Sequence, residues 1–68
     1  MSKRLAVELA REEDGRWIGA VPKLPGVLVY GKTEKEAYTK ARALALRVLA
    51  DRIEDGTIPS GPVDVALA

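Results

Sequence analysis

The fold is decided by one stretch near the N-terminus, residues 5–21, which read LAVELAREEDGRWIGAV. Apolar positions alternate through residues 4–11, and this period of two is typical of a half-buried strand. The turn residues Glu12-Glu13-Asp14-Gly15 follow, and a second apolar run extends over residues 17–21. A glycine-ended loop between two such runs predicts a β-hairpin.

The length of the hairpin loop determines which side chains share a face. A two-residue Asp14-Gly15 loop would leave Trp17 on the face that carries Glu8. A three-residue loop that ends in a left-handed glycine instead pairs Leu9 with Gly19. We expect the three-residue loop, because it gathers the large apolar side chains on one face, where their burial contributes several kcal/mol. That face holds Leu5, Val7, Leu9, Trp17 and Val21, and the opposite face holds Ala6, Glu8, Ala10, Ile18 and Ala20.

After the hairpin, the chain predicts a bend, a third strand and a long helix. Residues 22–26, PKLPG, form the bend, because proline cannot donate a backbone hydrogen bond to a sheet. The wholly apolar run 27–30 predicts a third strand, either in the centre of the sheet or at a covered edge. Thr33 and a glutamate three residues later form a capping box, which predicts a helix over residues 34–54. Gly56 is placed to end that helix.

Two apolar lines run along the predicted helix, whereas covering one sheet face requires only one of them. The second line therefore needs a cover, which is either the protein's own tail or another subunit. The main buried line holds Ala37, Ala41, Leu44, Ala45 and Val48. The second line, the candidate oligomer interface, holds Leu46, Leu49 and Ile53.

Alternation returns in residues 63–67, after a proline-containing connector, and predicts a last strand. The order strand, strand, strand, helix, strand predicts a single α+β domain over residues 1–68. We expect a three-stranded antiparallel sheet packed on one long helix, together with a short last strand. A domain this small buries only about 60% of the surface of its unfolded chain, so oligomerisation is an expected source of stability.

The composition limits the chemistry that the chain can perform. The 68 residues contain no cysteine and no histidine, and 11 Lys and Arg against 10 Asp and Glu give a net charge of +1. Zinc binding, thiol chemistry and a Ser-His-Asp triad are therefore not expected within one chain. A carboxylate metal site would need Glu8 to meet Asp64 or a helix carboxylate, and we expect solvated carboxylates instead. We predict no catalytic residue, no metal site, no cofactor and no direct nucleic-acid binding by this chain alone.

The chain also lacks the features of a membrane or exported segment. No stretch approaches the roughly 20 apolar residues that cross a bilayer, and Glu8 interrupts the first apolar segment. We therefore predict a cytoplasmic protein with no membrane partner.

Two segments resemble the HicB-type antitoxin family. Residues 14–26, DGRWIGAVPKLPG, resemble its acidic-glycine turn, its aromatic-led strand and its Pro-x-Leu-Pro-Gly bend. Residues 31–37, GKTEKEA, resemble its Gly-x-Thr-x-x-Glu-Ala helix start. The resemblance covers nearly the whole chain, and the bend followed by the helix start is more specific than either feature alone.

The resemblance implies a partial RNase H-like fold without the nuclease carboxylates. It also implies an antitoxin that occludes the active site of a small HicA-like, mRNA-cleaving toxin and that assembles into dimers or tetramers. Full members of the family usually carry a C-terminal DNA-binding segment. These 68 residues contain no such segment, so the resemblance does not extend to transcriptional autoregulation, and this role stays open.

Three functions remain open at this point. The first is a toxin-binding module, in which carboxylates pair with Lys and Arg of the toxin while a tryptophan and the bend supply apolar contact. The second is a solitary homo-oligomer with a structural or regulatory role. The third is a degenerate nuclease, which would cleave an RNA–DNA hybrid in the presence of a divalent metal. The predicted toxin contacts are Glu12, Glu13, Asp14, Trp17, Leu24 and Pro25.

Overall fold

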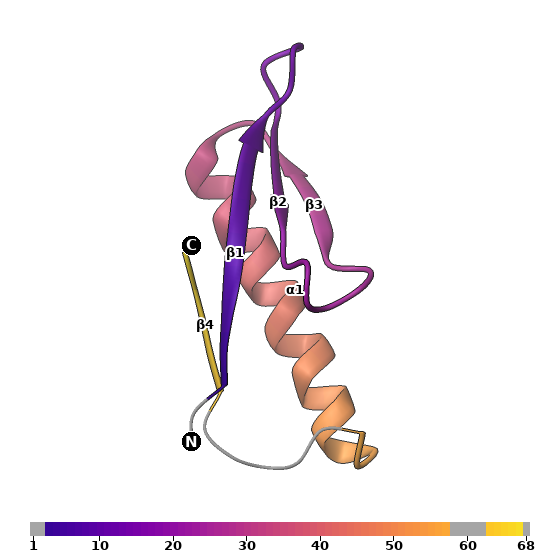
Figure 1. Cartoon of the computed structure of the whole chain (residues 1–68). Coiled ribbons are helices and arrows are strands. Elements are labelled where there is room, and N and C mark those ends of the chain that lie inside the picture. Colours follow the sequence, from indigo (N-terminus) through magenta and orange to yellow (C-terminus); the bar gives the residue numbers. More distant parts are fainter. Residues whose placement is uncertain (1–2, 58–62, 68) are drawn as a thin grey trace.

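The chain forms a four-stranded sheet with one long helix lying diagonally across one face (Figure 1). This computed structural model describes residues 3–57 and 63–67. The elements are β1 (Lys3–Arg11), β2 (Trp17–Ala20), β3 (Leu28–Gly31), α1 (Glu34–Glu54) and β4 (Val63–Leu67). The strand order is β3-β2-β1-β4, in which β4 runs parallel to β1 and the other neighbours are antiparallel. The predicted α+β class and order of elements are confirmed, and the last strand extends the sheet beside β1.

The β1–β2 hairpin has the predicted three-residue loop. Leu9 lies opposite Gly19, and Glu12 donates its backbone N–H to the Arg16 carbonyl at 2.7 Å, which closes the loop. Gly15 has a φ of 91°, a left-handed conformation that glycine adopts without steric cost. The large apolar side chains of both strands consequently share the face that packs on the helix, as predicted.

Small residues let the helix lie directly against β2 and β3. A Cβ atom on Gly19 would lie 2.6 Å from the Ala37 carbonyl oxygen, and one on Gly31 would lie 2.5 Å from the Ala37 backbone nitrogen. Both positions therefore require glycine, because a side chain there would collide with the helix backbone. The buried apolar residues of the core are Leu5, Val7, Val21, Leu24, Val27, Ala37, Ala41, Ala45, Leu49 and Val65.

Both ends of the helix are capped. Thr33 Oγ1 accepts a hydrogen bond from the Glu36 backbone N–H at 3.0 Å, as predicted. The Glu36 carboxylate pairs with Lys40 Nζ at 3.0 Å, so within the described residues only the threonine half of the capping box is formed. At the other end, Gly56 has a φ of 81°, and the two backbone hydrogen bonds of a Schellman motif close the helix at 3.3 and 2.9 Å.

The third strand does not occupy the position that its sequence predicts. Among the strands that the structure describes, β3 is an edge strand that pairs only with β2, and Leu28 and Tyr30 are 54% and 44% exposed. The expectation of a central or covered strand is therefore wrong, because in the part of the chain that the structure describes the helix covers only one face of the sheet. The strand also begins one residue later than predicted, since the Val27 carbonyl accepts the Val21 N–H at 3.2 Å and closes the bend.

The helix buries a different row of side chains from the predicted one. The buried row is Ala37, Ala41, Ala45 and Leu49, whereas Leu44 and Val48 are only partly buried. Residues four apart form rows that are inclined to the helix axis, so a helix that lies diagonally on a sheet buries such a row (Figure 1). Leu49 was predicted for the second line and is 3% exposed, which makes it a core residue. Among the described residues, no helix has the length and apolar character that a membrane crossing requires.

Candidate binding surface

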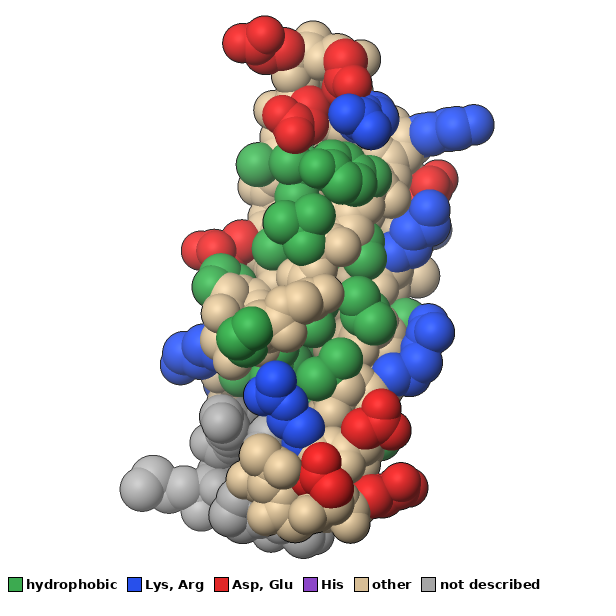
Figure 2. Space-filling view, turned by 90° about the vertical axis from the view of Figure 1, so that its right-hand side faces the viewer, with side chains coloured by type: hydrophobic (Ala, Val, Ile, Leu, Met, Phe, Trp, Pro, Cys, Tyr) green, Lys and Arg blue, Asp and Glu red, His purple; other side chains and the backbone are tan. Residues whose placement is uncertain are grey.

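The β1–β2 hairpin ends in an acidic tip, formed by Glu12, Glu13 and Asp14, which projects beyond the sheet (Figures 1 and 2). The Asp14 carboxylate accepts the Arg16 backbone N–H at 3.0 Å and pairs with Arg16 Nε at 2.7 Å. The backbone hydrogen bond from Arg16, together with this side-chain pair, lowers the pKa of Asp14. Asp14 is therefore engaged within the turn. In residues 3–57 and 63–67, Glu12 and Glu13 form no ion pair, so the tip offers two free carboxylates.

Arg16 also links the tip to the open face of the sheet. Its guanidinium carbon lies 4.8 Å from the centroid of the Tyr30 ring, within the range of a cation–π contact. Because Arg16 contacts both Asp14 and Tyr30, it connects the hairpin turn to β3.

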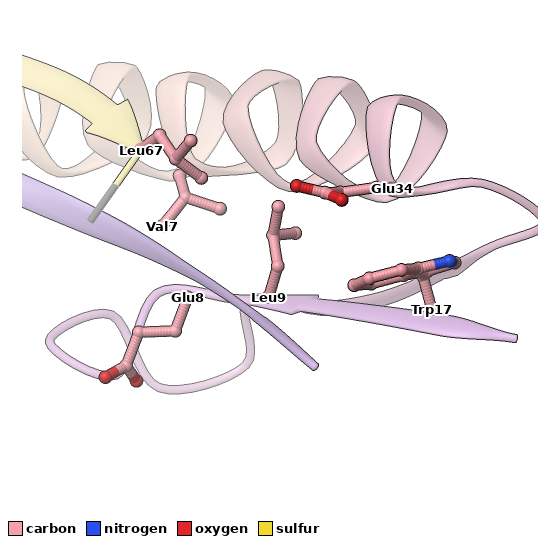
Figure 3. A pocket seen from close by; sticks show the side chains of 6 residues that line it. All are labelled: Val7, Glu8, Leu9, Trp17, Glu34 and Leu67. Carbon is pink, nitrogen blue, oxygen red and sulfur yellow. The ribbon is translucent and has the colours of Figure 1, made fainter. Parts of the chain in front are cut away.

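An open notch of about 430 Å³ lies beside the tip, and we call it the Trp17 notch (Figure 3). Leu9 of β1 rises toward the helix in its middle, the Trp17 ring of β2 lies on one side, and the Glu34 carboxylate reaches in from the first turn of α1. The side chain of Glu8 points to the opposite side of the sheet. Polar and apolar atoms contribute about equally to the surface of the notch, which has the Glu34 carboxylate at its rim. It is lined by Val7, Glu8, Leu9, Trp17, Glu34 and Leu67.

The notch lies at the end of the β1–β4 ladder formed by the described residues. The ladder between these strands ends where Val7 lies opposite Leu67. Alternate residues of an antiparallel strand direct both backbone polar groups to the same side, and Glu12 directs its groups toward β2. Leu9 and Arg11 lie an odd number of residues from Glu12, so their backbone N–H and C=O groups point to the opposite edge of β1. Within the described residues, no strand pairs with that part of the edge.

The six predicted toxin contacts do not form one surface. The acidic tip and Trp17 lie at the same end of the hairpin, since Trp17 pairs with Arg11 at the last ladder position before the turn. Leu24 is 2% exposed and belongs to the core, so its prediction as a contact is wrong. Its N–H donates to the Val21 carbonyl at 2.9 Å, which folds the bend inward. Pro25 is exposed, but it lies in the bend at the opposite end of β2 from the tip.

Five of the six residues that line the notch are absent from the predicted contacts, and two of these five, Glu34 and Leu67, come from outside the hairpin. In the sequence, Glu34 has the ordinary role of a carboxylate at the positive end of a helix dipole. Leu67 belongs to an alternating strand whose neighbour in the sheet is not evident from the sequence. The only available signal is that Glu34 directly follows the helix cap, where a side chain can reach strand ends.

The predicted oligomer line also changes. Leu46 is 43% exposed, Leu49 is buried in the core, and Ile53 is half-buried, so the line is not a continuous exposed surface. Large exposed apolar side chains are also found on β3, at Leu28 and Tyr30, and on β4, at Leu67. Figure 2 shows hydrophobic side chains gathered along the middle of the molecule on the β3 side, with acidic side chains above and below them.

The carboxylates of the sheet do not form a metal site. Asp64 lies 3.9 Å from Arg4, and both side chains are largely exposed. Among the residues that the structure describes, no three His, Cys, Asp or Glu side chains come together in a way that could hold a metal ion.

No protein-family model, curated protein or solved structure matches this chain. Its function is therefore inferred from the residues and the surfaces that they form.

Proposed function

We propose that this chain is a non-enzymatic protein-binding module of the HicB-like antitoxin type, which neutralises a small HicA-like ribonuclease toxin by occluding its active site. The observation that supports this most directly is the adjacency of the acidic tip and the Trp17 notch at one end of the hairpin. We assign the β3-β2-β1-β4 sheet and its single helix to the partial RNase H-like fold, and we place the protein in the cytoplasm, where such a toxin acts on mRNA.

The mechanism is steric and electrostatic. A ribonuclease binds its phosphate backbone substrate through Lys and Arg side chains, and the free carboxylates of Glu12 and Glu13 pair with such side chains. Asp14 contributes less, because Arg16 already neutralises it. Trp17 supplies a large and rigid contact area beside these charges, as tryptophans at interface centres do.

The test is binding to a basic, HicA-like ribonuclease encoded next to this chain. We expect complex formation by calorimetry and loss of mRNA cleavage in the presence of the chain. The double variant Glu12→Gln/Glu13→Gln should lower the affinity about fivefold to tenfold, the sum expected of two exposed ion pairs. The wild-type affinity should also fall as salt is raised.

A matched control removes two exposed charges at the far end of α1, in Asp51→Asn/Glu54→Gln. This variant should bind the ribonuclease as the wild type does. Equal weakening by both double variants would contradict the role of the tip, because only net charge would then matter. Failure to bind or inhibit the ribonuclease would overturn the proposed function.

A second function, the solitary homo-oligomer, is supported by a different observation. Tyr30 directs its backbone groups away from β2, and its carbonyl accepts a hydrogen bond from Lys40 Nζ at 3.4 Å. The Leu28 N–H on the same edge donates to the Gly26 carbonyl at 3.2 Å, so the edge is partly open, and it lies beside the exposed side chains of Leu28 and Tyr30. An apolar edge strand is a template for pairing with another chain, and a second copy presents the same edge.

A further inference from the structure

We propose that the Trp17 notch and the open edge of β1 together form a strand-addition site for an extended segment that carries a lysine or arginine. This inference deepens the proposed function and rests on it for the biological partner. The site combines three features: an open length of strand edge, a recess beside it with apolar side chains on its walls, and a carboxylate at the rim of the recess.

The open edge provides backbone hydrogen bonds. β4 occupies the first part of the outer edge of β1 and ends opposite Val7. Beyond that point, Leu9 and Arg11 direct their backbone N–H and C=O groups outward, with no partner strand among the described residues. An extended segment of another chain can form these bonds and continue the line of β4 along the same edge, which is how sheets accept added strands.

The recess provides a position for one side chain of the added segment. Side chains of a strand alternate between the two faces of a sheet, so a residue opposite this edge can point toward the helix. There it meets the side chains of Leu9, Trp17 and Leu67. These walls suit the methylene stem of a lysine or arginine, which buries its stem while its charged end stays near water.

The charges at the recess favour a basic residue. The Glu34 carboxylate lies over the recess (Figure 3) and forms no ion pair within residues 3–57 and 63–67. It can accept a charge-assisted hydrogen bond, and the indole face of Trp17 adds a cation–π contact. Arg11 shares this edge, but its guanidinium lies toward the turn, 4.0 Å from the Cβ position of Gly15. Glu12 and Glu13 of the tip add further negative charge.

The chain reports on this site directly, because Trp17 is its single tryptophan. The probe is the peptide acetyl-TKTKTKT-amide, titrated at low salt and followed by indole fluorescence and by amide NMR. We expect weak, saturable binding that shifts the indole N–H of Trp17 and the backbone amides of Leu9 and Arg11. The acidic peptide acetyl-TETETET-amide should bind at least tenfold more weakly. A backbone N-methylated form of the basic peptide should also lose at least tenfold in affinity, because it cannot complete the strand hydrogen bonds.

Two variants examine the carboxylate. Glu34→Gln preserves the size of the side chain and should lower the affinity for the basic peptide about threefold, the range of an exposed ion pair. Glu54→Gln, at the other end of the same helix, should leave the affinity unchanged. Equal binding of the acidic and basic peptides would overturn the proposal. NMR shifts confined to β3 or to the hairpin tip would overturn the proposal as well. This titration uses the wild-type chain, so it remains a test if Glu34→Gln alters folding.

The experiment separates this inference from the proposed function. If the basic peptide binds at the notch and no HicA-like ribonuclease is neutralised, the site stands and the antitoxin function falls. If the ribonuclease is neutralised while the signals of Leu9, Arg11 and Trp17 stay unchanged, the function stands and the strand-addition site falls.

Discussion

The two edges of the sheet are left open in different surroundings. At the β1–β4 edge, the backbone of Leu9 and Arg11 lies next to the Trp17 notch and to carboxylates of the hairpin tip and of Glu34. At the β3 edge, the partly bonded backbone lies beside the exposed side chains of Leu28 and Tyr30. Strand edges bind other chains through the same backbone groups. The neighbouring side chains therefore decide which chain is accepted.

This difference shows how a very small sheet can support two kinds of contact. The acidic edge with its recess suits a partner of opposite charge, and the apolar edge suits a second copy of this chain. Both edges depend on one scaffold, because α1 contacts all four strands. Variants can therefore remove both edges together or each one separately.

The largest effect is expected when both edges lose their common support. In Gly19→Val, the new side chain would collide with the Ala37 carbonyl, because even a Cβ atom would lie 2.6 Å from that oxygen. We expect a loss of about 3 kcal/mol in the free energy of unfolding, which a domain of this size cannot readily tolerate. Urea denaturation measures this loss. Ala20→Val, on the open face, is the control, and equal stability of the two variants would contradict the close packing of the helix.

The next effect should separate the two edges. If β3 pairs with a second copy, Leu28→Lys places a charge at the paired edge and should convert the oligomer into a monomer, as edge lysines do in natural sheets. Light scattering measures the mass, and the notch should still bind the basic peptide. A monomeric wild type would remove the homo-oligomer candidate. Dissociation by Leu46→Asp alone would place the interface on the helix instead.

A smaller effect is expected at the connection between β3 and the notch. Thr33→Ala removes the hydroxyl that accepts the Glu36 N–H and should cost about 1 kcal/mol. Fraying of the first helical turn would also release Glu34, so affinity for the basic peptide should fall while the oligomeric mass stays unchanged. Thermal unfolding measures the loss of stability. Thr39→Ala, an exposed position within the helix, should not reduce it.

The smallest effect is expected from a change of pH, to which one carboxylate near each edge contributes. The pKa of Asp14 is lowered from 3.8, mainly by the Arg16 backbone hydrogen bond, and that of Glu36 is lowered from 4.5, mainly by the hydrogen bond from Lys40. A lowered pKa in the folded state stabilises the fold above the unfolded value, and this stabilisation is lost as the pH falls through the folded value.

We therefore expect the melting temperature to fall as the pH is lowered through and below the ordinary pKa range of these carboxyl groups, and only modestly, because both groups are exposed and screened. Asp14→Asn should reduce the part of this pH dependence that comes from the tip. Glu36→Gln should reduce the part that comes from the β3 side. A steeper fall of the melting temperature at low pH in either variant would contradict a lowered pKa for the carboxyl group that it removes.

The features that could be predicted from the sequence are those set by local chemistry. The left-handed Gly15 and the pairing of Leu9 with Gly19 follow from one loop and its alternating neighbours. The bounds of α1 follow from Thr33 at one end and Gly56 at the other. Each of these features depends on residues close together in the chain. For the hairpin, the three-residue loop places more apolar side chains on one face than a two-residue loop would.

The features that could not be predicted depend on contacts between distant segments. The apolar sequence of β3 is typical of a strand that is covered on both faces. Only the position of the helix shows that one face of β3 is open. Leu49 is buried because α1 lies diagonally on the sheet, and no periodicity within the helix gives that angle. Leu24 is buried because the bend folds inward between Val21 and Val27.

The candidate site divides in the same way. The acidic tip and Trp17 are neighbours in the hairpin and could be predicted together. The rest of the notch comes from Glu34 and Leu67, which approach it from the start of α1 and the end of β4. The open edge at Leu9 and Arg11 depends on the point at which β4 stops, and this point is visible only in the sheet register.

The left-handed glycine of the hairpin loop restricts how this protein can evolve. Substitutions at Glu12 or Glu13 alter the charge of the tip and leave the pairing of β1 with β2 intact. Deletion of Glu13 would leave Asp14-Gly15 as a two-residue loop between the same partners, Glu12 and Arg16, and this sequence suits the turn that such a loop requires. Lineages that retain this fold should therefore vary the charge and the length of the tip while keeping its glycine.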